Sequence, residues 1–324
     1  MRMKKFLTLL LAGVMATFLL TACGSDGEKD NETADSNGDD EKLQVVGDFT
    51  IVSDIAEKVG GDRVEVYNVI PKGKEPHGWD PSPKDTKSTA DADVLFYFGW
   101  NLEGLDGDKN NWVYKMLHAA DKDKDDENVF ALSDGIDQLE LGTKEFAGTP
   151  NPHGFNTPKN GIKMVENARD AYIEIDPEYK EVYEENAEKL LNELKDLDQQ
   201  YEEKIGGIPE EDRILMSSER SFQYIADQYG LKEGFIWERD GESEGTPEQI
   251  INAINFVEEN EPKALFVEYT SDKRPMNTVS DETGVPIAGS LYSEDLGEED
   301  SYVDYLRHNL MTIVDGLNPD HQDD

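Results

Sequence analysis

The chain has 324 residues and a formal net charge of −41 at pH 7, with 72 acidic side chains against 31 basic ones. Because phosphate groups are bound by clusters of Lys and Arg, this charge excludes nucleic acid and anionic lipid surfaces as general partners. Cys23 is the only cysteine, so an intramolecular disulfide is excluded too, and the stability of the fold depends on its core.

The N-terminus has the pattern of a secretory signal peptide. Residues 1–22 carry Arg2, Lys4 and Lys5, followed by an uncharged apolar run that is short for a membrane span. The run ends in Leu-Thr-Ala before Cys23, which resembles the lipobox of bacterial lipoproteins, where the cysteine carries lipid. We therefore predict an extracytoplasmic protein, anchored through Cys23 to the outer face of the cell membrane. The alternative is a plain signal peptide with an incidental cysteine.

Composition and hydrophobic pattern divide the rest of the chain. After the cysteine, residues up to 42 are mainly Gly, Ser, Asp, Glu and Asn, which cannot bury enough apolar surface to order a segment. What remains is long enough for two domains of ordinary size. We predict a flexible acidic tether over 23–42, an N-terminal α/β lobe over 43–176, a long helix over 177–205, a C-terminal α/β lobe over 206–319 and a tail over 320–324.

The first lobe reads as an alternation of strands and helices. We predict strands over 43–46, 64–70 and 93–98 and helices over 51–59, over 101–118 and, after Gly161, over 162–172. This order predicts a parallel sheet, whose ligands bind in loops at the carboxyl ends of the strands. His118 has apolar neighbours in its helix, so we expect it to be packed or half-buried and leave it out of the site.

Two loops of this lobe present a histidine in the same setting. His77 lies in Glu-Pro-His-Gly-Trp-Asp-Pro-Ser-Pro-Lys-Asp (75–85), where the prolines predict a stiff loop rather than a helix or strand. His153 lies in Asn-Pro-His-Gly-Phe (151–155). One such histidine could belong to an ordinary surface turn, but the repetition favours a pair of metal ligands.

The longest regular feature is an apolar stripe. It begins after Pro177, a favourable first-turn residue, and its members recur at intervals of four or three residues: Tyr179, Tyr183, Ala187, Leu190, Leu194, Leu197 and Tyr201. Such a stripe indicates one helix about 40 Å long. It could form a coiled-coil dimer seam. Because α/β segments flank it on both sides, we expect instead that it packs along its own two lobes, joins them rigidly, and leaves the protein a monomer.

Strands and helices alternate again after the two glycines at 206–207. We predict strands over 213–216, 235–237, 263–268 and 285–288, helices over 222–229, from Thr246 onward and over 302–317, and a loop over 217–221. Both halves of the mature chain thus have the α/β pattern.

The order of the motifs resembles the solute-binding lipoproteins of manganese, zinc and iron ABC importers. The motifs are the lipobox, P-H-x-W-D-P-x-P-x-D, a second P-H, S-E before a Phe-containing helix, E-G-T-P-E-Q, L-F-V-E followed by R-P-M, and L-Y-S-E-D-L. The resemblance covers 43–317. It implies two α/β lobes joined by one long helix, a metal bound between them, and an ABC transporter permease as the partner that receives it.

The same resemblance implies four metal ligands. They are His77, His153, Glu219 and the acidic residue of the segment Tyr292–Asp295, where the family usually has Asp followed by Ser. We favour Glu294 and keep Asp295 as the alternative. The family usually has Asp-Pro-His-x-Trp around the second histidine, whereas this chain has Asn and Phe at the first and last positions.

Two imidazoles and two carboxylates form a mixed nitrogen and oxygen site, which suits Mn²⁺, Fe²⁺ or Zn²⁺. Glu219 can bind through two oxygens and so favours a harder ion, which makes Mn²⁺ the first choice. A third histidine at this position would favour zinc. Zn²⁺ still binds such a set at least as tightly as Mn²⁺, so a zinc-specific protein remains an alternative.

Two other classes of protein are compatible with an anchored extracellular chain. A metal-dependent hydrolase could use the same ligands to activate water. The sequence has no His-Glu-x-x-His motif and offers no obvious acid/base residue for an open coordination position, so we do not expect an enzyme. A lipoprotein that serves in cell adhesion, with incidental histidines, is the third class, and it predicts folding and melting that do not depend on metal.

Overall fold

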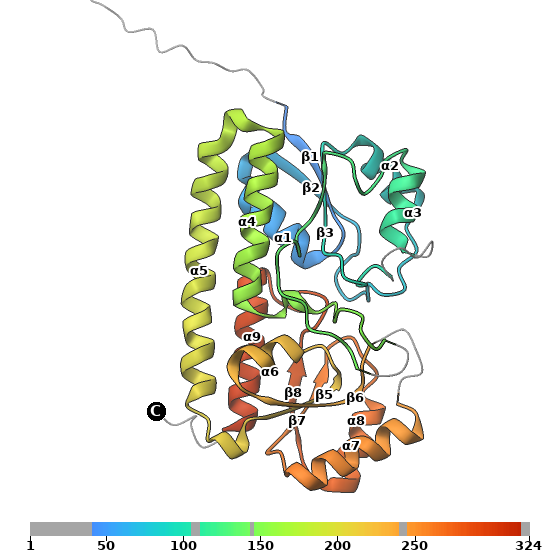
Figure 1. The fold of residues 1–324 in the computed structure, drawn as a ribbon, viewed down its shortest axis with the longest axis vertical. Coiled ribbons are helices and arrows are strands. Elements are labelled where there is room, and N and C mark those ends of the chain that lie inside the picture. Colours follow the sequence, from blue (N-terminus) through green and yellow to red (C-terminus); the bar gives the residue numbers. More distant parts are fainter. Residues whose placement is uncertain (1–40, 105–110, 143–145, 240–244, 319–324) are drawn as a thin grey trace, which may run out of the picture. The chain divides into compact units, whose positions relative to one another are not determined.

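The computed structural model describes residues 41–104, 111–142, 146–239 and 245–318. The predicted signal peptide, Cys23, the tether up to residue 40 and the tail 320–324 lie outside this part of the chain. Two four-stranded parallel sheets, each flanked by helices, form two lobes (Figure 1). No helix in the described ranges is long and apolar enough to cross a membrane.

The first lobe is built on a sheet with strand order β2-β1-β3-β4. Its strands are β1 (Leu43–Gly47), β2 (Val64–Asn68), β3 (Val94–Tyr97) and β4 (Val129–Ala131), and its helices are α1 (Thr50–Gly60), α2 (Pro83–Asp91) and α3 (Trp112–Ala119). Helix α1 contacts three of these strands, while α2 and α3 contact each other. Every strand pair is parallel, as the alternation of strands and helices predicts.

The second lobe repeats this plan with strand order β6-β5-β7-β8. Its strands are β5 (Ile214–Glu219), β6 (Lys232–Trp237), β7 (Leu265–Glu268) and β8 (Ile287–Leu291), and its helices are α6 (Gln223–Tyr229), α7 (Pro247–Asn260) and α8 (Arg274–Thr283). Helices α7 and α8 pack together against the strands. A small apolar core lies between them and the sheet.

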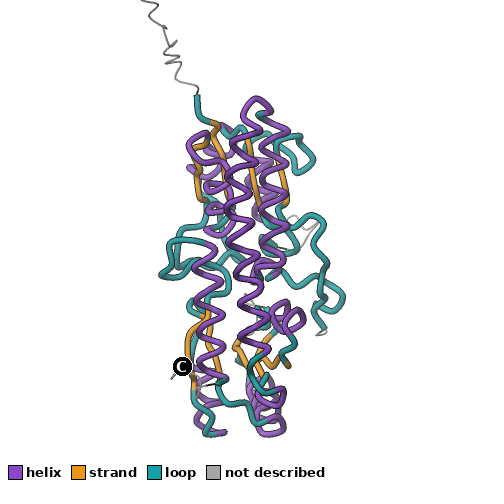
Figure 2. The backbone as a smooth tube through the Cα atoms, turned by 90° about the vertical axis from the view of Figure 1, so that its left-hand side faces the viewer, coloured by secondary structure: helices purple, strands orange, loops and turns teal. Residues whose placement is uncertain are grey.

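Three helices run beside the two lobes: α4 (Pro158–Ile175), α5 (Lys180–Gly206) and α9 (Tyr302–Leu317). Helix α5 has 27 residues and contacts α1 and α4 on one side of the cleft and α6 and α9 on the other. The strands lie in two groups behind these helices in Figure 2. The prediction of one long helix that joins both lobes is therefore confirmed.

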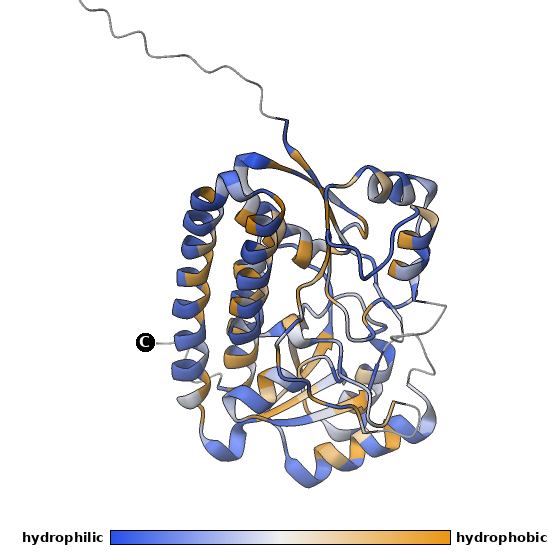
Figure 3. Ribbon diagram, turned by 45° about the horizontal axis from the view of Figure 1, so that its top comes forward, coloured by the Kyte–Doolittle hydropathy of each residue, from blue (hydrophilic) through white to orange (hydrophobic). Residues whose placement is uncertain are grey.

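The apolar stripe of α5 is buried inside the chain. The buried members are Tyr183, Ala187, Leu190, Leu191, Leu194, Leu197, Tyr201 and Ile205. Colouring by hydropathy places the apolar residues of α4 and α5 on the sides that face the protein (Figure 3). Because the stripe packs against α1, α4, α6 and α9, it is not available as a coiled-coil dimer seam.

Side-chain caps fix the N-terminal ends of α2 and α4. Ser82 accepts from the backbone N–H of Asp85, and the Asp85 carboxylate accepts from the N–H of Ser82, so a capping box starts α2. Thr157 accepts from the N–H of Asn160 at the start of α4. Both helices have proline as their first residue, where its missing N–H costs no hydrogen bond.

Several predicted boundaries were wrong. The stiff segment 75–85 ends in helix α2, because the capping box makes Pro83 a helix start. Residues 217–219 belong to strand β5 instead of a loop. Of the predicted helix 101–118, α3 occupies only its C-terminal part within the described residues, and 101–104 form a turn. Strand β4 and helix α8 were not predicted.

Candidate metal centre

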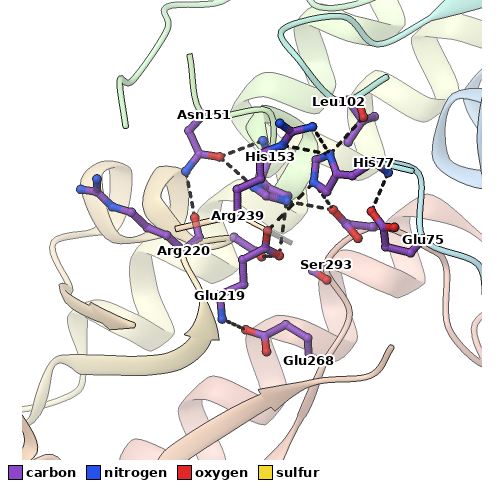
Figure 4. Close-up of polar contacts among 12 residues, drawn as sticks. Glu75, His77, Leu102, Asn151, His153, Glu219, Arg220, Arg239, Glu268 and Ser293 are labelled. Carbon is purple, nitrogen blue, oxygen red and sulfur yellow. Dashed lines mark hydrogen bonds and ion pairs between the residues drawn. The ribbon is translucent and has the colours of Figure 1, made fainter. Parts of the chain in front are cut away.

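Four side chains from distant parts of the chain converge between the lobes. One ligand atom from each of His77, His153, Glu219 and Glu294 lies within 4.8 Å of the others. The Nε2 atoms of His77 and His153 lie 2.7 and 3.1 Å from Oε1 of Glu294. The same two nitrogens lie 4.0 and 3.6 Å from the Glu219 oxygens. Figure 4 shows both imidazoles and Glu219 pointing toward one spot.

The carboxyl ends of parallel strands supply these positions. His77 lies in the loop that follows β2, and His153 lies between β4 and α4. Glu219 is the last residue of β5, and Glu294 follows β8. Two residues thus come from each lobe, in the kind of loop where parallel sheets bind ligands.

All four side chains are shielded from solvent, with exposed fractions of 0 or 1%. The Nε2 atom of His77 and the Oε2 atom of Glu294 are buried and have no hydrogen-bond partner. The 2.7 Å contact of His77 with Glu294 is therefore close without having hydrogen-bond geometry. Buried polar atoms are rarely left without a partner, and donor atoms that face one spot fit a cation.

The chain matches, over residues 45–316, the family described as zinc-uptake complex component A periplasmic. It is 37% identical over 319 residues to the iron ABC transporter substrate-binding lipoprotein MtsA of Streptococcus pyogenes serotype M1, covering 97% of this chain and 99% of that one. It is 35% identical, with the same coverage, to the manganese ABC transporter substrate-binding lipoprotein PsaA of Streptococcus mitis. The chain belongs to the family of metal ABC transporter substrate-binding lipoproteins.

Solved structures support the same family fold. The Mn-bound periplasmic metal binding protein of candidatus Liberibacter asiaticus has a TM-score of 0.74 at 26% identity, covering 84% of this chain and 98% of that one. The periplasmic zinc binding protein TroA of Treponema pallidum shares the fold, with a TM-score of 0.76 at 20% identity over 85% of this chain and 99% of that one. The relatives are transport proteins, so this chain is a solute-binding protein and not an enzyme.

Asn151 orients His153 within the substrate-binding lipoprotein. Its Oδ1 atom accepts from the backbone N–H of His153 and lies 2.8 Å from the ring Nδ1. The Asn151 amide nitrogen donates to the carbonyl of Arg220 and to the side chain of Gln223, which leaves its oxygen to accept from the ring. With an ion in the site, the hydrogen of His153 would sit on Nδ1, where Asn151 accepts it, and the lone pair of Nε2 would bind the ion.

His77 has three neighbours that hold its ring and backbone. Its backbone N–H donates to the Glu75 carboxylate, and its Nδ1 atom lies 3.0 Å from the carbonyl oxygen of Leu102. The guanidinium of Arg239 lies on the same side of the ring, with Nη2 3.0 Å from Nδ1. Sequence reasoning assigned no role to Glu75, which opens the segment 75–85, and missed Arg239, which no motif marks.

Glu219 is fixed by the strand end and by the serine that follows. Ser221 donates its hydroxyl to Oε2 of Glu219 at 2.6 Å. The backbone N–H of Glu219 donates to the carboxylate of Glu268 on the neighbouring strand β7. Strand β5 reaches Glu219 through Ser217 and Ser218, which are both buried.

Glu294 and Asp295 face different partners. Asp295 accepts from the backbone N–H of Gly297 at 2.6 Å and from the N–H of Gly73 in the first lobe. It lies outside the group of four converging side chains, which includes Glu294. The extra methylene of Glu294 carries its carboxylate to both imidazoles, while Asp295 fastens the two lobes beside them.

Burial and charge act in opposite directions on the carboxyl groups of the cleft. Burial disfavours the charged form of Glu294, but His77 and His153 outweigh this and lower the pKa of its carboxyl below the usual range. Burial raises the pKa of Glu75, which also lies close to Glu294. Burial raises the pKa of Glu268 to about 7, against the hydrogen bond from Glu219.

The other described histidines lie outside the site. His118 is exposed on α3, which corrects the expectation that it is packed or half-buried. His308 on α9 is half-buried, bonds the carbonyl of Ser290 at 3.0 Å and stacks on Tyr292. Neither has a neighbouring set of donors like that around His77.

Proposed function

We propose that this protein captures a divalent transition metal with His77, His153, Glu219 and Glu294 and delivers it to the permease of an ABC importer. Mn²⁺ is the favoured cargo. The observation that carries the proposal is the convergence of four buried donors, two from each lobe, within 4.8 Å. The four residues lie far apart in the sequence, yet their side chains point to the same place, which a metal-binding role would explain.

The chemistry of the donors supports Mn²⁺ as the first choice. Each oxygen of Glu219 lies within 4.0 Å of a different imidazole nitrogen, which suits binding through both oxygens and a higher coordination number. Two carboxylates balance the charge of a divalent ion, so the loaded site can stay buried without an unpaired charge. The absence of a thiolate from this set also favours a harder ion.

Iron and zinc are the alternatives. The names of the relatives include iron and manganese, and that of the structural neighbour TroA includes zinc. Zn²⁺ binds nitrogen and oxygen donors at least as tightly as Mn²⁺, so selectivity has to come from coordination geometry and from supply.

Metal titration of the mature chain, after chelation, tests the proposal. We expect Mn²⁺, Fe²⁺ under anaerobic conditions, and Zn²⁺ each to raise the melting temperature with one ion bound per chain. His77→Ala, His153→Ala and Glu219→Ala should each remove most of the shift. His118→Ala removes an exposed histidine outside the group of four and should leave the shift unchanged. Equal shifts in all four variants would refute the ligand set. A wild-type melting temperature that does not change with metal would favour the alternative of a lipoprotein that serves in cell adhesion.

We further propose that Cys23 carries the lipid that anchors a monomer to the outer face of the cell membrane. The relatives are named lipoproteins, which supports this placement. A labelled fatty acid should be incorporated into the wild type and not into Cys23→Ser in a cell that makes lipoproteins. Equal labelling of the two proteins would contradict lipid attachment at this residue.

A further inference from the structure

Arg239 reaches across the cleft from the second lobe, two residues beyond the end of β6. Its Nη2 donates to the backbone carbonyl of Asn101 in the first lobe at 2.9 Å. Its Nε and Nη2 atoms lie 3.2 and 3.0 Å from Nδ1 of His77, and its guanidinium faces the ring of Phe146. A fixed positive charge therefore lies directly behind one proposed metal ligand (Figure 4).

The carbonyls that meet Arg239 and His77 belong to a constrained turn, 99–104. Trp100 and Asn101 have φ angles of 57° and 74°, which non-glycine residues rarely adopt. The Glu103 carboxylate accepts from the N–H of Gly99 and holds the start of the turn. The turn therefore holds the carbonyl oxygens of Asn101 and Leu102 in fixed positions. The Asn101 oxygen contacts Arg239, and the Leu102 oxygen contacts His77.

The Nδ1 atom of His77 faces two partners that make opposite demands. The Leu102 carbonyl can only accept, so it requires a hydrogen on Nδ1. The Arg239 guanidinium can only donate, so it requires a lone pair on the same atom. A neutral imidazole has one ring hydrogen, and the two bonds cannot form together.

Metal decides between these two arrangements. An ion on Nε2 uses that lone pair, so the hydrogen sits on Nδ1 and Leu102 accepts it. Without an ion, Nδ1 can accept from Arg239, and the ring hydrogen then sits on Nε2. Arg239 then bonds both His77 and Asn101 only in the metal-free protein.

We propose that Arg239 is a positioning residue that stabilises the closed, metal-free cleft and thereby weakens metal binding. The inference rests on the proposed function. Two effects act in the same direction. The bond to His77 has to be given up when metal binds, and the guanidinium repels a cation in a site that excludes water. Arg239 would thus favour release of the cargo over tight retention.

Arg239→Gln tests this inference, because it removes the charge while keeping a polar side chain. We expect its affinity for Mn²⁺ and Zn²⁺, measured by dye competition, to be about tenfold tighter than that of the wild type, the value of one charge-assisted hydrogen bond. The metal-free variant should melt at a lower temperature, and the metal-loaded variant should melt close to the wild type. A residue with a purely structural role would weaken binding when replaced.

Two further variants control for charge and for folding. Arg274→Gln makes the same change of charge on an exposed arginine of the same lobe and should leave affinity unchanged. Arg239→Lys keeps the charge but cannot bridge both partners in the same way, and its affinity should fall between wild type and Arg239→Gln. If both Arg239 variants bind metal with an affinity equal to or weaker than that of the wild type, the inference about Arg239 is overturned and the proposed function is not. A wild-type protein that binds neither metal would overturn the proposed function as well.

Discussion

Replacing Glu294 by alanine should impair metal binding, whereas replacing Asp295 by alanine should lower the stability of the metal-free protein. Glu294 contacts both imidazoles, whereas Asp295 accepts from two backbone N–H groups. We expect Glu294→Ala to lose the metal-induced rise in melting temperature. Asp295→Ala should keep that rise and melt at a lower temperature without metal.

The size of the effect follows from the contacts. Metal at 100 times its dissociation constant stabilises the wild type by about 2.7 kcal/mol, or about 5–10 °C for a chain of this size. Loss of a group that only supports a ligand weakens metal binding about 10–100-fold, so loss of a ligand should reach at least about 100-fold. At the same metal concentration Glu294→Ala would then gain only about 0.4 kcal/mol. Asp295→Ala should lose roughly 1.5–3 kcal/mol for each hydrogen bond to its carboxylate.

Differential scanning fluorimetry of chelated protein, with and without Mn²⁺ or Zn²⁺, measures both quantities. Glu294→Gln serves as a control of similar size and shape that removes the charge. The reverse pattern, with a full metal shift in Glu294→Ala and none in Asp295→Ala, would assign the fourth ligand to Asp295. It would then be clear that the closed cleft described here is not the metal-binding arrangement.

Three further outcomes can be measured on the same protein. Acidification should release metal, because metal ligands bind in their deprotonated forms; affinity that does not depend on pH would contradict ligation by ionisable side chains. Burial raises the pKa of Glu268 to about 7, so its contribution to stability is complete below the ordinary carboxyl pKa and is lost as pH rises through 7. Glu268→Gln should therefore melt above the wild type at about pH 8 and level with it at about pH 5 in metal-free protein, and an equal difference at both values would rule out this ionisation. Gly161→Ala places a methyl group 2.7 Å from the Tyr302 hydroxyl. It should lower the free energy of unfolding, measured with denaturant, by about 1–3 kcal/mol, while the metal-induced rise in melting temperature is retained.

The sequence was informative where one physical signal controlled the local structure. Apolar runs located the sheets because a parallel strand is covered on both faces, and the stripe of α5 located the long helix. The two Pro-His-Gly segments marked His77 and His153, because two of the five histidines of the chain share this setting. The resemblance to a known family supplied Glu219 and Glu294.

The remaining features depend on contacts that no local pattern records. Helix α2 starts within a segment rich in proline, because Ser82 and Asp85 cap each other there. Strand β5 extends through two serines, which the pattern of apolar residues had assigned to a loop. Arg239 has no motif, and its role emerges only when the turn around Asn101 meets it from the other lobe. Contacts between residues more than a hundred positions apart require the folded structure.

The residue that orients His153 is an amide, and this has a consequence for how firmly an ion is held. A carboxylate at position 151 would carry a full negative charge against the ring N–H and would make the imidazole a stronger electron donor. Asn151 offers only a carbonyl dipole, since its nitrogen is already committed to Arg220 and Gln223. His153 is held in the correct orientation but is less electron-rich. An ion on this histidine would dissociate more readily, which suits a site that fills and empties repeatedly.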